Sequence, residues 1–120
     1  MSDELYSTRS VDGVKVLAFQ QSHILDAATI DRMSAGLKEA IETATETKFL
    51  FDFDRVGYLS SNALGMLIGL QRRIAQRKGR LKLAGIHPEV MEVFRITKLD
   101  TVFDIYKDAP SAIETFRKNL

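Results

Sequence analysis

Hydrophobic and polar residues alternate along residues 5–20, which is the pattern of paired β-strands. Asp12-Gly13 divides this stretch into two short runs, and the dipeptide suits the tight turn of a hairpin. In the second run, residues 14–19, apolar side chains fall on both faces. We therefore expect a hairpin whose second strand is covered on both sides.

The spacing becomes helical in residues 22–44, where apolar residues recur every three or four positions. They form a single stripe, which consists of Ile30, Met33, Leu37 and Ile41. Asp26 lies where an N-cap belongs, and its carboxylate also suits the positive end of the helix dipole. The segment is predicted to be an amphipathic helix.

Strand-like and helix-like segments then alternate along the rest of the chain. Short apolar runs predict three more strands, at residues 48–56, 80–86 and 101–106. Each is followed by a predicted helix, at residues 61–78, 87–99 and 111–120. The apolar residues that we expect these helices to bury are Ala63, Leu64, Leu67, Ile68, Leu70, Ile74, Val90, Met91, Val93, Phe94, Ile113 and Phe116.

The predicted order of elements is β-β-α-β-α-β-α-β-α. Because strands alternate with helices, crossover connections are needed, and these favour a mostly parallel or mixed sheet with helices packed on it. The chain has 120 residues, the length of one ordinary domain. We expect a single α/β domain over residues 1–120, with a mixed sheet of four to five strands and about four helices.

Composition removes several classes of function. The net charge is +1, so bulk charge indicates neither nucleic acid nor a membrane surface as a direct partner. No cysteine is present, which excludes a disulfide, a thiol nucleophile and a cysteine metal site. The first ten residues lack a signal pattern, and no run approaches the roughly 18 apolar residues of a membrane span. We expect a cytoplasmic protein that is a monomer or a weak homodimer.

Charge is uneven along the chain, although its total is small. Residues 1–60 hold six basic and ten acidic residues, a net −4, and residues 61–120 hold eleven and six, a net +5. Much of this excess lies in residues 71–82, with Arg72, Arg73, Arg77, Lys78, Arg80 and Lys82. The segment could bind an anion or nucleic acid, or it could be the solvated face of a helix with cations at its C-terminus. The lack of interleaved aromatic residues favours the solvated face.

Ser60 and Ser61 lie where a strand passes into the second predicted helix. One serine can cap the helix by accepting hydrogen bonds from its free N–H groups, and the other would display its hydroxyl on the first turn. A phosphate added there would be held by the helix N-terminus and would add about −1.5 to −2 charges to the surface. The pair is either a plain cap or a cap beside a phosphorylation switch, and spacing alone favours the plain cap.

Catalytic alternatives find little support in the motifs. The serines lie in "YLSSNAL" rather than in Gly-x-Ser-x-Gly, and neither His23 nor His87 is close to them in sequence. No segment matches the P-loop or the dinucleotide fingerprint. Asp52 and Asp54 could bind a metal ion, but without further ligands they suit hydrogen bonds to neighbouring turns equally well. We expect that the protein is not an enzyme and that it holds no cofactor and no metal ion.

Three segments together resemble the STAS domain of bacterial anti-sigma factor antagonists. They are "VLAFQQSHILDAATIDRM", "FLFDFDRVGYLSSNALGML" and "GRLKLAGIHPEVMEVFRITKLDTVFDIY". The resemblance spans about residues 6–116 and is most specific at the second helix, where the family usually reads Asp-Ser-Ser/Thr/Ala-Gly-Leu-Gly. By position, Ser61 matches the serine that a partner kinase phosphorylates. Ser60, an alternate acceptor, replaces the usual aspartate.

Further residues carry over from the same resemblance. Asp26 in "ILDAATI" matches a Leu-Asp motif that lies near the phosphorylation site, and Asp52 matches an acidic or amide residue of the preceding strand. Asn62 replaces the small hydroxyl residue, Ala63 replaces the glycine, and Leu64 matches. The partner-binding residues that the resemblance implies are Asp26, Ser60, Ser61, Asn62 and Leu64.

The resemblance implies a partner-switching regulator. The unphosphorylated protein would bind an anti-sigma factor that is also a serine kinase and so free the sigma factor. Phosphorylation of Ser61 would end that binding, and a phosphatase would restore it.

Two rival hypotheses stay open. One is a STAS scaffold or signalling subunit that assembles with itself or with sensor proteins without a switch. The changed residues Ser60 and Ala63 support it, as does the apolar strand 14–19, which could pair with another chain. The other is an anion- or nucleotide-binding module at the helix N-terminus, for which no glycine loop is present.

Overall fold

The computed structural model describes residues 5–24 and 26–118. The strands are β1 (Tyr6–Val11), β2 (Val14–Phe19), β3 (His23–Ile24), β4 (Lys48–Asp52), β5 (Tyr58–Leu59), β6 (Arg80–Ala84) and β7 (Asp104–Tyr106). The α-helices are α1 (Ala27–Thr43), α2 (Ser61–Gln76), α3 (Pro88–Ile96) and α4 (Ala109–Arg117). One 3₁₀ turn, η1 (Leu99–Thr101), follows α3.

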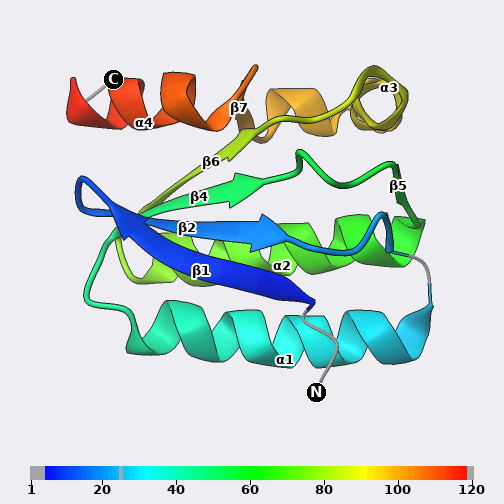
Figure 1. The fold of residues 1–120 in the computed structure, drawn as a ribbon. Coiled ribbons are helices and arrows are strands. Elements are labelled where there is room, and N and C mark those ends of the chain that lie inside the picture. The colour runs from blue at the N-terminus through cyan, green and yellow to red at the C-terminus, as the bar shows by residue number, and fades with distance from the viewer. Residues whose placement is uncertain (1–4, 25, 119–120) are drawn as a thin grey trace.

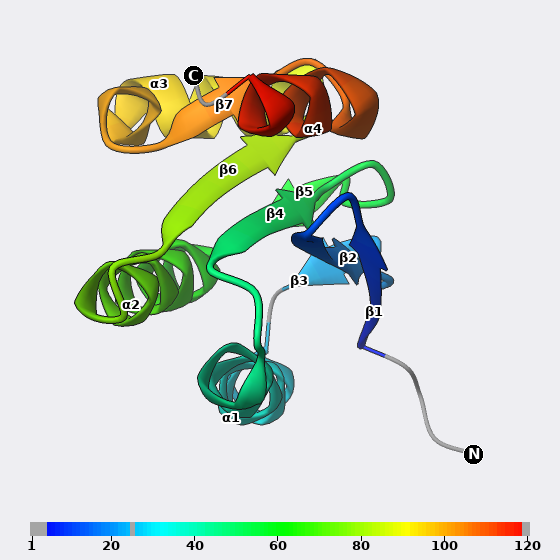
Figure 2. The same cartoon turned by 90° about the vertical axis from the view of Figure 1, so that its left-hand side faces the viewer.

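Five strands form the main sheet in the order β1-β2-β4-β6-β7. β1 and β2 are antiparallel and all other neighbours are parallel, so the predicted mixed α/β sheet is confirmed. Figures 1 and 2 show α1 and α2 side by side on one face of the sheet and α4 on the other. No helix in the described part of the chain is both long and apolar enough to cross a membrane.

The core divides into two clusters, one on each face of the sheet. Leu17 and Phe19 of β2 belong to the large cluster with α1, α2 and α3, and Val14 and Val16 belong to the smaller cluster with α4. The expectation that this strand is covered on both sides is therefore confirmed. However, β2 lies between β1 and β4, so the suggestion that it could pair with another chain is wrong.

Local sequence explains most element boundaries. Asp12 and Gly13 both have positive φ values, 51° and 80°, as the predicted two-residue hairpin turn requires. Asp26 caps α1 and Asp108 caps α4, each through its side chain. The predicted stripe of α1 is buried as expected, with Ile30, Met33, Leu37 and Ile41 in the core.

Some predicted boundaries were wrong. Residues 23–24 form β3 instead of the first turn of a helix, and α1 begins only after its cap at Asp26. α3 ends at Ile96, three residues before the predicted end, because Lys98 turns the backbone into the left-handed region. The last helix ends at Arg117, and residues 119–120 of the predicted helix lie outside the described residues.

The predicted burial along the helices is mostly confirmed. Met66 is buried on α2 although it was not expected to be, whereas Ile68, Met91, Val93 and Ile113 are only half-buried.

The basic segment is only partly the solvated face that we expected. Arg73 pairs with Glu42 of α1, and the guanidinium of Arg77 donates to the carbonyls of Ile41 and Ala44 at the end of α1. The expectation fails for Lys82, which is 1% exposed and lies in the sheet. Several of these cations therefore hold elements together.

Candidate functional site

A short parallel pair of strands brings the starts of two helices together. β3 precedes α1, β5 precedes α2, and the two strands pair with His23 opposite Tyr58 and Ile24 opposite Leu59. The Ser60 amide then donates to the Ile24 carbonyl at 3.0 Å. The N-termini of α1 and α2 therefore lie side by side at the same end of the molecule (Figure 1).

Each of these helix starts is capped by its own side chain. A carboxylate oxygen of Asp26 accepts from the Thr29 amide at 3.0 Å, and Ser60 Oγ accepts from the Ala63 amide at 3.3 Å. The hydrogen bond from Thr29 lowers the pKa of Asp26 below its ordinary value of 3.8, so this exposed carboxylate carries its charge at neutral pH. The cap function that the sequence suggested for the serine pair therefore belongs to Ser60.

Ser61 is the first residue of α2 and is exposed. Within the described residues its hydroxyl has no hydrogen-bond partner, because Ser60 supplies the cap. Asn62, the next residue, is also exposed. The first turn of α2 thus displays two polar side chains above free backbone N–H groups.

Leu64 differs from the other residues that the resemblance singled out. It is 5% exposed and packs in the core, while Asp26, Ser61 and Asn62 face solvent and Ser60 is half-buried. A partner could reach Leu64 only through the residues around it. The partner-binding role of all five residues stays a prediction.

A depression of about 290 Å³ lies between the first turns of α1 and α2. Ile30 and Met66 give it an apolar floor, and Asp31, Ser34 and Asn62 line its polar rim. The sequence indicated Ile30 as a core residue but gave no signal that it borders an open surface. Because Asn62 belongs to this rim, the depression is continuous with the exposed start of α2.

The residues considered for catalysis or metal binding have other tasks. A ring nitrogen of His87 lies 2.6 Å from the Asp54 carbonyl oxygen, and the His23 ring lies 3.0 Å from the hydroxyl of Ser22. Asp52 accepts from the Asp54 amide at 3.1 Å, as the turn interpretation predicts. Among the residues searched, no group of three or more histidine or acidic side chains could hold a metal ion.

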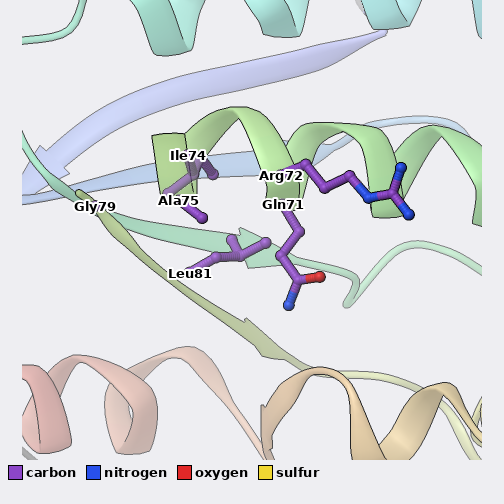
Figure 3. Close-up of a pocket in the computed structure, with 6 residues that line it drawn as sticks. All are labelled: Gln71, Arg72, Ile74, Ala75, Gly79 and Leu81. Carbon is purple, nitrogen blue, oxygen red and sulfur yellow. The ribbon is translucent and has the colours of Figure 1, made fainter. Parts of the chain in front are cut away.

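A second depression, of about 230 Å³, lies beside the C-terminal half of α2 (Figure 3). Its lining residues are Gln71, Arg72, Ile74, Ala75, Gly79 and Leu81. Gln71 donates from its side-chain amide to the Val102 carbonyl at 3.0 Å, and Arg72 extends away from Leu81 (Figure 3). α2 has 16 residues and is roughly 24 Å long, so this depression is remote from Ser61.

These features define an open α/β sheet flanked by helices, with two capped helix starts side by side and an exposed serine on one of them. The sequence model of the STAS domain matches residues 6–112, and the chain belongs to this family. The predicted family and the predicted fold are both confirmed.

This chain is similar to known proteins and to solved structures. The anti-sigma-B factor antagonist of Listeria monocytogenes is 30% identical over 86 residues, which cover 68% of this chain and 75% of the relative. The structure of an anti-sigma factor antagonist from Mycobacterium paratuberculosis is 19% identical, covers 93% of this chain and 92% of its own, and has a TM-score of 0.81.

The structure of the anti-sigma factor antagonist SpoIIAA in its unphosphorylated form is also similar, with 20% identity and a TM-score of 0.69 over 93% of this chain and 97% of its own. The phosphorylated form of SpoIIAA from Bacillus matches with the same identity and TM-score. At these identities the structural likeness establishes the fold.

Proposed function

We propose that this chain is an anti-sigma factor antagonist, and that a phosphate on Ser61 controls its binding to an anti-sigma factor with serine-kinase activity. The observation that carries the proposal is the exposed hydroxyl of Ser61, unpaired within the described residues, beside the cap that Ser60 already supplies. A kinase can therefore modify Ser61 without removing the hydrogen bond that starts the helix.

The local electrostatics explain how a phosphate would act. The free N–H groups of α2 favour an anion at this position, so a phosphate on Ser61 would leave the helix intact. It would add about −1.5 to −2 charges close to the ionised carboxylate of Asp26. A partner that covers this surface would have to remove water from both anions, and the complex would dissociate.

Two of the departures from the family pattern, at Ser60 and Ala63, are compatible with a switch. Ser60 replaces the usual aspartate, and both residues are good N-caps. Ala63 replaces the usual glycine and is fully buried inside the first turns of α2, where alanine favours a helix. Ser61 is exposed with both of these residues in place.

The rival hypothesis of a non-switching scaffold loses much of its support. It rested on Ser60 and Ala63, which act as a cap and a helix former, and on strand β2, which is internal to the sheet. The free edges of the main sheet are β1 and β7.

The partners in this proposal follow from the relatives. The Listeria relative is an anti-sigma-B factor antagonist, and SpoIIAA exists in phosphorylated and unphosphorylated forms. By analogy, a phosphatase would restore the binding-competent form of this chain. We place the protein in the cytoplasm, as one STAS domain over residues 1–120 that acts without catalysis, cofactor or nucleic-acid contact, as a monomer or weak homodimer.

Titration calorimetry against the serine-kinase anti-sigma factor whose gene lies nearest tests the proposal. Ser61→Asp should weaken binding about tenfold or more, equivalent to roughly 1.4 kcal/mol, while Ser61→Ala should bind like the wild type. Thr45→Asp is the matched control, because it adds the same charge at an exposed position beyond the opposite end of α1. Equal affinity for all four proteins would overturn the proposal.

A further inference from the structure

Tyr58 is an unusually exposed aromatic residue at the end of the molecule that carries Ser61. Three large hydrophobic side chains in the described residues are strongly exposed: Tyr58 at 50%, Ile96 at 72% and Val102 at 48%. Ile96 ends α3 and Val102 follows η1, whereas Tyr58 belongs to β5, directly before the cap of α2. Exposed aromatic residues of this kind often mark a contact surface.

Tyr58 does not stand alone. Its ring stacks on that of His23, with centroids 6.5 Å apart and planes inclined by 27°. The two residues are register partners in the β3–β5 pair, so their side chains share one face of it. We call Tyr58 and His23 the aromatic pair.

The backbone beneath the aromatic pair is firmly held. The Ser22 carbonyl accepts from the amides of both Gly57 and Tyr58, at 2.7 and 3.2 Å. On the opposite face of the two strands, Ile24 and Leu59 are buried in the core. The aromatic pair is therefore presented on a fixed backbone, which lowers the entropy cost of ordering this segment on binding.

The aromatic pair is close enough to Ser61 to enter the same interface. Ser61 follows Tyr58 by three positions in the sequence, which limits the distance between their Cα atoms to about 11 Å. A standard interface buries roughly 800 Å² on each partner and easily spans that distance.

We infer that the aromatic pair is an affinity anchor for the anti-sigma factor, an inference that rests on the proposed function. Tyr58 inserts into an apolar pocket of that partner, with its hydroxyl at the pocket rim. Tyr58 contributes binding energy whether or not Ser61 carries a phosphate, while the phosphate on Ser61 determines whether the total affinity is high enough for a stable complex. The depression between α1 and α2 receives the partner on the other side of the switch.

The charges at this end of the molecule favour a different protein over a second copy of this chain. The ionised, exposed carboxylate of Asp26 lies at the start of the neighbouring helix. A symmetric contact between two copies through the aromatic pair would place an Asp26 carboxylate of each copy close to the same interface, since Asp26 is three residues after His23, and like charges at an interface are costly.

The test measures affinity for the same serine-kinase anti-sigma factor with Tyr58→Ala and Tyr58→Phe. Tyr58→Ala should weaken binding by about 10- to 100-fold, whereas Tyr58→Phe, which keeps the ring, should weaken it by less than about fivefold. Val102→Ala is the control, because Val102 is equally exposed on another part of the surface. The loss from Tyr58→Ala should be the same in wild-type and Ser61→Asp backgrounds, because an anchor and a switch that act independently have additive effects.

The outcomes separate this inference from the proposed function. If Ser61→Asp weakens binding and Tyr58→Ala behaves like Val102→Ala, the anchor is overturned and the switch stands. If neither substitution has an effect, or the wild type does not bind, both ideas fail. A shift of the isolated protein from dimer to monomer on Tyr58→Ala, seen by sedimentation, would instead assign the aromatic pair to self-association and overturn the anchor.

A modification experiment on the wild-type protein provides a second test that needs no variant. Nitration of exposed tyrosines should modify Tyr58 in the free protein, because Tyr6 and Tyr106 are each partly buried. The anti-sigma factor should protect Tyr58 in the complex. Unchanged nitration of Tyr58 in a saturated complex would contradict the inference.

Discussion

Lys78 and Gly79 end α2 for two different physical reasons, which the sequence did not reveal. The helix was predicted to end at residue 78, and the amides of Lys78 and Gly79 donate to the carbonyls of Ala75 and Ile74, which is the pattern of a Schellman motif. The left-handed residue, however, is Lys78, with φ 61°. Gly79 is needed for space, because a Cβ there would lie 2.7 Å from the Thr47 carbonyl oxygen.

This geometry predicts opposite effects at the two neighbouring positions. Lys78→Gly should raise the free energy of unfolding by about 0.5–1 kcal/mol, because glycine has no Cβ and adopts the left-handed conformation without steric strain. Gly79→Ala should lower the free energy of unfolding, because the added methyl group would clash with the backbone carbonyl of Thr47. Urea unfolding of both variants measures the difference, and stabilisation by Gly79→Ala would contradict the structure.

The cap at Asp26 predicts a dependence of stability on pH. Its pKa is lower in the folded protein than its ordinary value of 3.8, so the carboxylate adds stability above about pH 4 that is lost as the pH falls through the folded pKa. Asp26→Asn keeps a capping oxygen but carries no charge. The difference in unfolding free energy between wild type and Asp26→Asn should be constant above about pH 5 and should shrink at lower pH.

Thermal or chemical unfolding between pH 2 and 7 measures this difference. Asp108 caps α4 through the Ser111 amide at 2.9 Å, and its pKa is also lowered by the hydrogen bonds with Ser111. Asp108→Asn should therefore show the same trend. A difference that stays unchanged down to pH 2 for Asp26→Asn would show that the charge of the cap contributes nothing.

At the scale of elements, β1 offers a direct test of strand register. The Gln20 amide donates to the Leu5 carbonyl, which makes these two residues a hydrogen-bonded pair. In an antiparallel ladder hydrogen-bonded and non-hydrogen-bonded pairs alternate, so the Arg9 amide faces β2 and the Thr8 amide faces outward. Proline is tolerated in an edge strand where its missing N–H would face solvent. Thr8→Pro should cost about 1 kcal/mol of stability, and Arg9→Pro about 3 kcal/mol or more.

Urea unfolding compares these two variants, which differ by one position in the same strand. If Thr8→Pro were the more damaging substitution, the register of β1 on β2 would be wrong by one residue, and every side chain of β1 would lie on the opposite face.

The ion pair of Lys82 with Asp104 links β6 to the short edge strand β7. Lys82 Nζ lies 3.0 Å from a carboxylate oxygen of Asp104 and 2.8 Å from the Tyr106 hydroxyl, and it lies over the rings of Tyr106 and Phe116. Lysine is buried here because its stem is apolar and its charge has partners. The sequence alone suggested a solvated cation, since the partners come from a distant part of the chain.

Replacing either partner of this pair should have different effects. Lys82→Met keeps the volume of the stem and removes the charge, so it should change stability by less than about 1.5 kcal/mol. Asp104→Ala removes the carboxylate from a buried ammonium and should cost about 1–3 kcal/mol, reduced by the half-exposure of Asp104. The loss from Asp104→Ala should nearly disappear in the Lys82→Met background, and persistence of the full loss there would contradict the pairing.

β3 and β5 show where element prediction reaches its limit. Each strand has two residues, too few to leave a pattern, and each exists because the other lies beside it. The long helices were predictable because their apolar stripes repeat over many turns. The cap residues Asp26 and Ser60 were predictable because a cap depends only on the next three residues.

At the scale of the whole molecule, the order of the α-helices and of the five main-sheet strands along the chain was predictable, whereas the order of strands within the sheet leaves no local pattern in the sequence. The site depends on that missing information. The residue pattern indicated Ser60, Ser61 and Asp26 separately, and their proximity was expected only from the family resemblance; the pairing of β3 with β5 shows how the two helix starts adjoin. The aromatic pair was missed for the same reason, because His23 and Tyr58 are 35 residues apart in the sequence.

The separation of function across the molecule also appears only in three dimensions. The start of α2 displays the serine, while its C-terminal half supplies cations that hold α1 in place. The excess of positive charge in the second half of the sequence is thus partly used within the fold. Under the proposed function, the end of the molecule that carries Ser61 contacts the partner.

The intact mass of the protein after incubation with ATP, Mg²⁺ and the serine-kinase anti-sigma factor whose gene lies nearest is the decisive test of Ser61 as the switch. We expect a gain of one phosphate in the wild type, the same gain in Ser60→Asn, which keeps a capping side chain, and no gain in Ser61→Ala. A phosphate that persists in Ser61→Ala, or a wild type that forms the complex and gains none, would contradict the assignment of Ser61 as the switch.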